Sequence, residues 1–83
     1  MSTLQEVKNI LAQSLQLGPR ADGLTADSPL LGALPELDSM AVVGILTAME
    51  EHFGFSVGDD EISADVFATL GTLADFADQK LSN

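Results

Sequence analysis

The sequence predicts an all-α protein, a small four-helix bundle with a long first loop and a short third helix. Three observations support this fold class. Apolar residues recur at three- and four-residue steps in several segments, which is the helical period. No segment shows the strict alternation of a strand. The chain has 83 residues, of which 46% are hydrophobic, enough for one core, and we therefore expect a single domain over residues 1–83.

The first helix is expected at residues 3–17. Thr3 and Glu6 have the spacing of a capping box, in which each side chain satisfies a free backbone donor at the helix start. Gly18-Pro19 is expected to end the helix, because proline cannot continue the hydrogen-bond ladder. The predicted apolar stripe consists of Leu4, Val7, Ile10, Leu11 and Leu15.

The second helix is expected at residues 39–53, after a long loop from Arg20 to Leu37 that has no regular period and is held by its leucines. Asp38 suits the N-cap, because its carboxylate can accept backbone N–H groups at the positive end of the helix dipole. Gly54 suits the C-terminal end. The predicted inward stripe consists of Val42, Ile45, Leu46, Met49 and Phe53.

The other faces of this helix are also apolar or small, with Met40, Val43, Gly44, Thr47 and Ala48. Such a helix is either buried on all sides or offers a binding surface, and in so short a chain we favour the second interpretation. Gly44 costs roughly 1 kcal/mol relative to alanine within a helix. It would allow a partner to approach closely, or it is simply an unselected cost.

Two further helices complete the predicted bundle. The third, at residues 60–67, would begin with the acidic run 59–61, which the helix dipole favours, and its inward side chains would be Ile62, Val66 and Phe67. The fourth, at residues 70–81, would be capped by Thr69 and would carry Lys80 near its negative end. Its predicted stripe consists of Leu70, Leu73, Phe76, Ala77 and Leu81.

Charge and composition limit the class of partner. Thirteen acids against three bases give a net charge of −10, which disfavours nucleic acid and anionic membrane surfaces and favours partners with basic patches. No apolar run is long enough for a membrane span, and the N-terminus does not resemble a secretory signal, so the expected location is the cytoplasm. The chain has no cysteine, so any thiol chemistry requires an added group.

Catalysis by the polypeptide alone is not expected. Ser39 and the single histidine, His52, lie on the same predicted helix, about 20 Å apart at 1.5 Å per residue, so they cannot form a nucleophile–base pair. The acidic run 59–61 lacks the glycine and the terminal glutamate of a calcium loop, and it is interpreted as a helix start. Glycine-rich phosphate loops are also missing. We therefore predict neither an enzyme nor a metal site.

Ser39 is the candidate for modification. A serine just inside a helix N-terminus has its hydroxyl at the surface, near free backbone N–H groups that favour an anionic phosphate. The neighbouring Asp38 could help hold a metal ion while a separate enzyme transfers the group. An Asp-Ser pair is also a common helix cap, so on these two residues alone the purely structural interpretation stays open.

Three blocks of sequence carry a family resemblance. Leu37-Asp38-Ser39-Met40 opens an apolar helix that ends in Met49-Glu50-Glu51-His52-Phe53-Gly54, and this arrangement resembles the acyl and peptidyl carrier protein family. Upstream, Asp27-Ser28-Pro29-Leu30-Leu31 is similar to the loop anchor of that family. Downstream, the stretch 65–76 is similar to its third helix, turn and fourth helix. Together the blocks cover nearly the whole chain in the right order.

The resemblance implies a cofactor and a set of partners. Ser39 would accept 4′-phosphopantetheine from coenzyme A, through a separate magnesium-dependent phosphopantetheinyl transferase. The thiol of this arm would carry acyl or aminoacyl groups as thioesters between loading, modifying and transfer enzymes. Asp38 would cap the helix and help position the metal and the transferase. Such a protein would be a discrete carrier, expected as a monomer, in fatty acid, polyketide or nonribosomal peptide biosynthesis.

Two departures from the family pattern concern the docking surface. Met40 replaces the usual leucine, and Ala41 and Gly44 stand where carriers of the main fatty acid synthase usually bear acids. Acids return only at Glu50 and Glu51. We therefore expect apolar docking in a specialised pathway, and residues 30–43 resemble free-standing carriers of bacterial exopolysaccharide loci. The expected partner-binding residues are Met40, Val43, Gly44, Thr47, Glu50 and Glu51.

An alternative function belongs to a different class. The chain could be a carrier-like fold used only as an acidic interaction module, with Ser39 left unmodified. The two hypotheses differ in one measurable property, which is whether the chain accepts the arm from a transferase.

Overall fold

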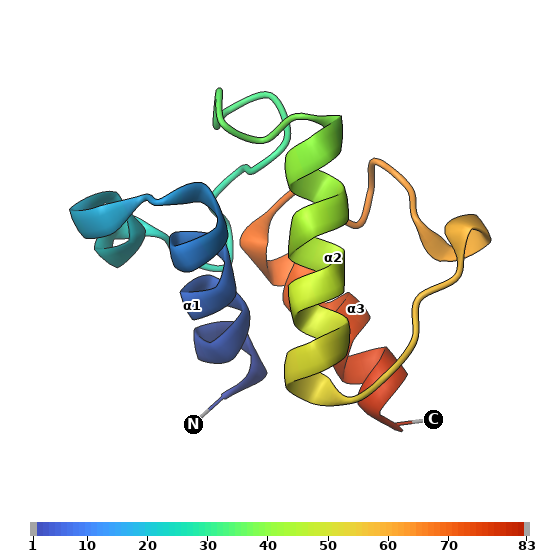
Figure 1. Ribbon diagram of the computed structural model, residues 1–83. Coiled ribbons are helices and arrows are strands. Elements are labelled where there is room, and N and C mark those ends of the chain that lie inside the picture. Colours follow the sequence, from blue (N-terminus) through green and yellow to red (C-terminus); the bar gives the residue numbers. More distant parts are fainter. Residues whose placement is uncertain (1, 83) are drawn as a thin grey trace.

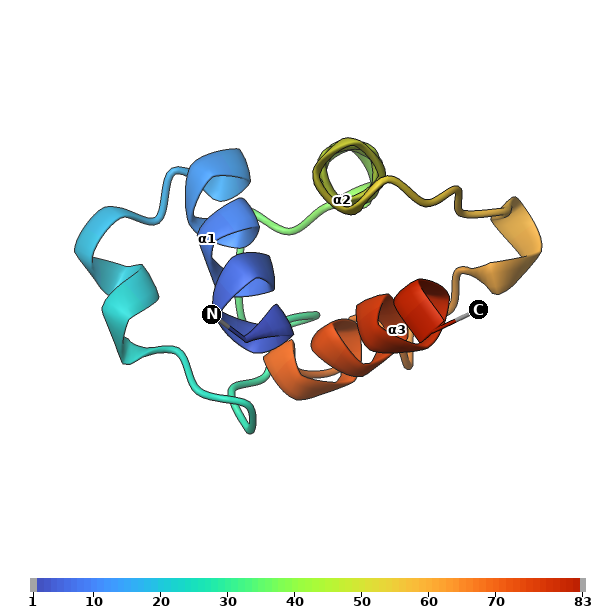
Figure 2. The same ribbon diagram turned by 90° about the horizontal axis from the view of Figure 1, so that it is seen from below.

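The structure is a computed structural model that describes residues 2–82, with the side chain of Asp59 excepted. Three α-helices surround one core, and α1 packs against both α2 and α3 (Figure 1). Seen from below, two 3₁₀ turns lie on opposite sides of this three-helix arrangement (Figure 2). None of the helices in the described part is long and apolar enough to cross a membrane. The elements are α1 Thr3–Leu15, η1 Gly18–Gly23, α2 Ser39–Phe53, η2 Asp59–Glu61 and α3 Leu70–Ser82.

Both ends of α1 differ from the prediction. The N-cap is Ser2 rather than Thr3, and its hydroxyl accepts the backbone N–H of Gln5 at 3.1 Å. The helix ends at Leu15 instead of residue 17, because Gln16 adopts a left-handed conformation (φ 53°). This reversal turns Leu17 into the core, where it is only 3% exposed. Gly18-Pro19 then begins η1 rather than ending the helix.

The apolar stripes of the three α-helices form most of the core. The predicted inward residues of α2 divide into three that are buried and two, Val42 and Phe53, that are partly buried against the core. Leu81, which was expected to face inward from α3, is 46% exposed, so that prediction is wrong. The buried residues of the α-helices are Val7, Ile10, Leu11, Leu15, Ile45, Leu46, Met49, Leu70, Leu73, Ala74 and Ala77.

The predicted third helix at residues 60–67 does not form. Only η2 is helical, and the residues that follow make isolated turns, with the N–H groups of Val66 and Phe67 bonded to the carbonyls three residues earlier. Phe67 is buried as predicted, whereas Ile62, also expected inward, is 36% exposed. A helix of two turns is hard to nucleate, and the backbone N–H groups of residues 61–68 that form hydrogen bonds only close isolated turns to carbonyls three residues earlier.

The long first loop pairs with the segment before α3. The N–H groups of Leu30 and Leu31 donate to the carbonyls of Ala68 and Phe67, each at 3.0 Å, and an isolated β-bridge joins Pro29 to Thr69. Leu30 is fully buried beneath this pairing. The prediction that leucines hold the loop is confirmed for Leu30 and Leu37, which are buried, and is wrong for Leu31, which is 46% exposed. The backbone pairing was not predicted.

The start of α3 is capped as the sequence predicts. The hydroxyl of Thr69 accepts the N–H of Thr72 at 3.1 Å, and the hydroxyl of Thr72 accepts the N–H of Thr69 at 3.0 Å. Gly71 lies against the first loop, and its N–H donates to the carbonyl of Ala26 at 2.8 Å. A Cβ at position 71 would come within 2.8 Å of that carbonyl oxygen, so glycine is required for this close approach.

Candidate functional site

The N-terminus of α2 is closed by Asp38. Its carboxylate accepts the N–H of Ala41 at 2.8 Å, and its carbonyl accepts the N–H of Val42 at 2.9 Å. The residue itself is extended (φ −109°, ψ −175°), as expected for an N-cap. The side-chain cap determines the direction in which the chain enters the helix, and hence the position of the next residue, Ser39.

Ser39 is the first residue of α2, and it is exposed. Its hydroxyl takes part in none of the side-chain hydrogen bonds found among residues 2–82. Asp38 takes the N–H of Ala41, whereas the N–H groups of Ser39 and Met40, at the start of the helix, have no hydrogen-bond acceptor among residues 2–82. An accessible hydroxyl beside free N–H groups fits an anionic phosphate ester, which the positive end of the dipole favours.

The turn before α2 carries an ion pair. Glu36 pairs with Arg20 of η1, and the hydrogen bond from the guanidinium, followed by that from its own backbone N–H, holds the pKa of this carboxyl below its usual value. Leu37 is buried and its N–H donates to the carbonyl of Leu34 at 3.0 Å. The approach to Ser39 is thus held by one apolar anchor and one charged pair.

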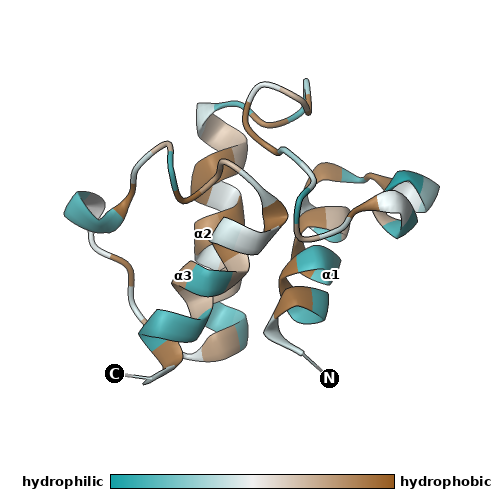
Figure 3. Ribbon diagram, turned by 180° about the vertical axis from the view of Figure 1, so that it is seen from behind, coloured by the Kyte–Doolittle hydropathy of each residue, from teal (hydrophilic) through white to brown (hydrophobic). Residues whose placement is uncertain are grey.

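An apolar surface follows Ser39 along α2. We call it the α2 patch, and it comprises Met40, Val43, Gly44 and Thr47, all exposed. Met40 is 82% exposed and Val43 is 63% exposed. No other group lies within 4 Å of a Cβ built on Gly44, so the space above this glycine is open. Coloured by hydropathy, α2 is pale or brown over most of its length (Figure 3).

The two glutamates at the far end of α2 have different environments. Glu51 is exposed, whereas the half-buried Glu50 accepts the N–H of Val57 at 2.7 Å and so holds the segment after the helix. A shallow groove runs beside the α2 patch and includes Val57 and Ile62 from this segment. Sequence reasoning did not place either residue at the surface beside α2, because no local period marks their position.

His52 lies at the opposite end of α2 from Ser39. Its Nε2 is 3.1 Å from a carboxylate oxygen of Glu6 on α1, and its ring packs edge-on against Phe53. The prediction that Ser39 and His52 do not meet is confirmed, since they lie at the two ends of one helix. In the described part of the chain, no three His, Asp or Glu side chains are grouped to hold a metal ion.

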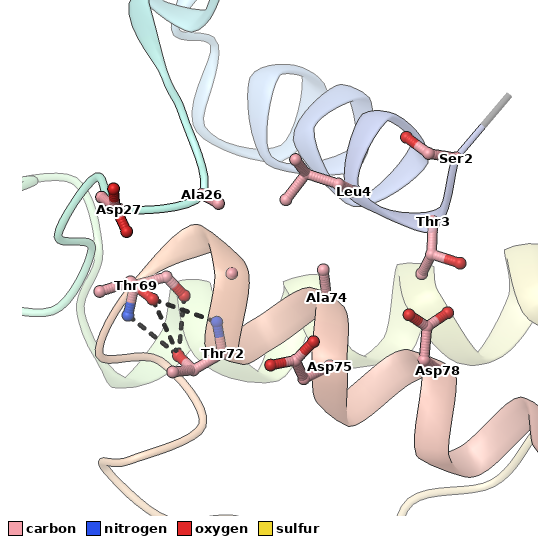
Figure 4. Close-up of a pocket in the computed structure, with 11 residues that line it drawn as sticks. Ser2, Thr3, Leu4, Ala26, Asp27, Thr69, Thr72, Ala74, Asp75 and Asp78 are labelled. Carbon is pink, nitrogen blue, oxygen red and sulfur yellow. Dashed lines mark hydrogen bonds between the residues drawn. The ribbon is translucent and has the colours of Figure 1, made fainter.

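One hollow lies away from α2, between the start of α1, the first loop and α3 (Figure 4). Three acids, Asp27, Asp75 and Asp78, line it, together with Thr69 and Thr72 of the helix cap. It contains none of the predicted site residues.

Comparison with known proteins identifies the family. Residues 5–78 match the sequence model described as "Phosphopantetheine attachment site". The chain is also 60% identical to a holo acyl carrier protein from Nitrosomonas europaea, whose solution NMR structure superposes with a TM-score of 0.92. That similarity covers 100% of both chains.

Proposed function

The chain belongs to the phosphopantetheine attachment-site family, and from this premise we propose that Ser39 is the attachment residue of a discrete acyl carrier protein. Members of this family are carriers without catalytic activity of their own, and they hold covalent 4′-phosphopantetheine received from a separate transferase. The arm supplies a thiol, which a chain without cysteine cannot provide. Every other part of the chemistry belongs to partner enzymes.

The single observation that supports Ser39 is its position. It is exposed at the capped start of α2, and its hydroxyl is not engaged by another side chain in residues 2–82. In the transfer, its oxygen forms a bond to the phosphorus of the coenzyme A pyrophosphate that carries the pantetheine. The pyrophosphate P–O bond breaks, 3′,5′-ADP leaves, and the hydroxyl proton passes to a base outside this chain.

Asp38 has two proposed roles in this step. Its cap on the N–H of Ala41 holds the first turn of α2, so the Ser39 hydroxyl is presented in one orientation. The exposed carboxylate also lies beside the reacting serine, where it could help position the metal ion that the transferase brings. Orienting one reactant reduces the entropy lost in the bimolecular encounter.

The α2 patch is the proposed docking surface for partner enzymes, with Glu51 at its far end. The exposure of Met40 and Val43 and the open space above Gly44 support apolar docking. Glu50 contributes less in this proposal, because its carboxylate already accepts the N–H of Val57. Ala41 and Gly44 stand where carriers of the main fatty acid synthase usually bear acids, which supports a specialised biosynthetic pathway. We further propose a monomer in the cytoplasm that carries an acyl or aminoacyl cargo.

Intact mass after incubation with coenzyme A, magnesium and a permissive transferase tests the attachment site. We expect one phosphopantetheine on the wild-type chain and none on Ser39→Ala. Ser63→Ala, which removes another exposed serine, is the matched control and should be modified normally. An arm on Ser39→Ala would show that the residue is wrong. A wild-type chain that several transferases leave bare, yet that still binds a partner, would favour the alternative of an unmodified acidic interaction module.

The mass of the protein purified from its own host tests the pathway. An acylated or aminoacylated arm would identify the class of cargo directly. A cargo of ordinary straight-chain fatty acids in all growth conditions would contradict the specialised pathway.

A further inference from the structure

Among residues 2–82, Arg20 is the only base that forms an ion pair with the segment leading to Ser39. The described residues form three ion pairs. The pair between Arg20 and Glu36 joins η1 to the turn before α2, at a position three residues before the serine. The backbone hydrogen bonds of residues 34–38 that close this turn are local. Leu37 donates to Leu34 at 3.0 Å and Asp38 donates to the carbonyl of Glu36 at 3.1 Å. Apart from the burial of Leu37 and the packing of Leu34 against the core, the Arg20 pair is the restraint that ties this turn to another part of the fold.

The two ends of the pair differ in how firmly they are held. The N–H of Arg20 donates to the carbonyl of Leu17 at 3.2 Å, and Leu17 and Ala21 on either side are buried in the core. The backbone of Arg20 is therefore fixed. Glu36 is 33% exposed, and its Oε1 is buried without a hydrogen-bond partner among residues 2–82. The guanidinium of Arg20 is the charged group that pairs with this carboxylate in the described part of the chain.

We propose that Arg20 is a positioning residue for the modification of Ser39, acting through Glu36 to hold the turn that presents Asp38 and the serine. This inference rests on the proposed function, because it assumes that a transferase must recognise the turn. Without Arg20, the Glu36 carboxylate moves toward water, and the turn is no longer tied to η1. Ser39 is then presented in more orientations. We expect this to raise the transferase KM more than it lowers kcat.

Transferase kinetics on two matched variants test the proposal. Arg20→Gln and Lys80→Gln each remove one base from a glutamate pair, and each changes the net charge from −10 to −11. Lys80 lies on α3 and pairs with Glu61, outside α2 and its preceding turn. Since exposed pairs are worth up to about 1 kcal/mol, we expect the transferase KM for Arg20→Gln to rise about threefold above that for Lys80→Gln, with kcat nearly unchanged. Equal KM values for the two variants would overturn the proposal.

A charge swap separates positioning from direct contact with the transferase. Arg20→Glu and Glu36→Arg should each raise KM, while the double variant restores the pair and brings KM back toward that of the wild type. Amide exchange at Ala41 and Val42, whose N–H groups donate to Asp38, should be faster in Arg20→Gln than in Lys80→Gln, and slow again in the double variant. A double variant without rescue would overturn the proposal. A wild-type chain that never accepts the arm would instead contradict the proposed function, so the two failures are distinguishable.

Discussion

Asp38 has an observed role in the fold, as the N-cap of α2, and a proposed role in the modification of Ser39. Its carboxylate accepts the N–H of Ala41 at 2.8 Å and so replaces a partner that the helix itself cannot supply. The same bond sets the geometry of Ser39, the next residue. A change at Asp38 should therefore alter both the free energy of unfolding and the rate of modification.

Asp38→Ala should lower the free energy of unfolding by about 0.5–2 kcal/mol, because a backbone donor loses its acceptor. Asp38→Asn is the matched control, since it removes the charge but keeps an oxygen that can accept the same N–H. Its loss should be clearly smaller. Urea unfolding followed by far-UV circular dichroism measures both, as the chain has no tryptophan or tyrosine. Equal losses for the two variants would indicate that charge, rather than the hydrogen bond, is what matters.

Glu61 gives a pH-dependent contribution to stability. The Lys80 ammonium at 2.6 Å, and then the N–H of Gly58, hold the pKa of Glu61 below the ordinary value of 4.5. Because the folded pKa is the lower one, this contribution is fully present above pH 4.5 and is lost as pH falls through the folded pKa. Lys80 thus stabilises the fold at neutral pH and not in strong acid.

Melting temperatures of Glu61→Gln as a function of pH test this contribution. Glu51→Gln, which removes one exposed negative charge elsewhere, is the control. At pH 7 we expect Glu61→Gln to melt below Glu51→Gln, and the difference should shrink as pH falls below 4.5. A difference in melting temperature that stays constant across this pH range would show that the Lys80–Glu61 pair is not its cause.

At the scale of one element, α2 has two apolar faces with different purposes. Met49 is fully buried against the other helices, whereas Met40, on the same helix, is 82% exposed. Burial of the first stabilises the fold through removal of apolar surface from water. Exposure of the second leaves apolar surface for a partner. Substitution of each methionine in turn therefore compares the effect of a buried and an exposed side chain of the same type on one helix.

Met49→Ala should lower the free energy of unfolding by about 2–5 kcal/mol, because it leaves a cavity in the core. Met40→Ala should change it by no more than about 0.5 kcal/mol, because the site is at the surface. Chemical denaturation of both variants measures the difference. If the α2 patch is the docking surface, Met40→Ala should still weaken transfer by partner enzymes. A large loss of stability in Met40→Ala would mean that this face is packed rather than free.

At the scale of the whole molecule, charge is the dominant property. Thirteen acids face three bases, and three of those acids, Asp27, Asp75 and Asp78, converge on the same hollow beside α1 and α3 (Figure 4). Like charges repel one another in the compact state, and added salt screens that repulsion within about 10 Å at 0.1 M. The described ion pairs are too few to offset it.

The melting temperature should therefore rise from low to moderate sodium chloride. Asp78→Asn, which removes one acid of the hollow, should raise the melting temperature at low salt and show a smaller further increase with salt. Differential scanning calorimetry over a salt series measures both effects. A melting temperature that does not change with salt would argue that the acids are too far apart to repel one another.

The sequence was sufficient to predict the parts of the fold that depend on the helical spacing of apolar residues and on neighbouring cap residues. The apolar stripes at helical spacing located α1, α2 and α3, and the cap residues Asp38 and Thr69 marked the starts of two of them. The candidate site was also predictable, because Ser39 and its cap are adjacent in the chain. In each case the interacting groups are within four residues of one another, so sequence spacing is a direct measure of their distance.

The remaining features depend on partners that are distant in sequence. Residues 60–67 do not form a helix and Ile62 is exposed, and the first loop pairs with the backbone of residues 67–71, at the end of that segment. The pairing of Arg20 with Glu36 and of Glu50 with the N–H of Val57 likewise has no signature in any local period. Sequence by itself determined most of the side chains that enter the core and the position of the candidate serine, Ser39, at the start of α2. Only the tertiary structure decided which loops support that serine, because those contacts exist only after distant segments have packed together.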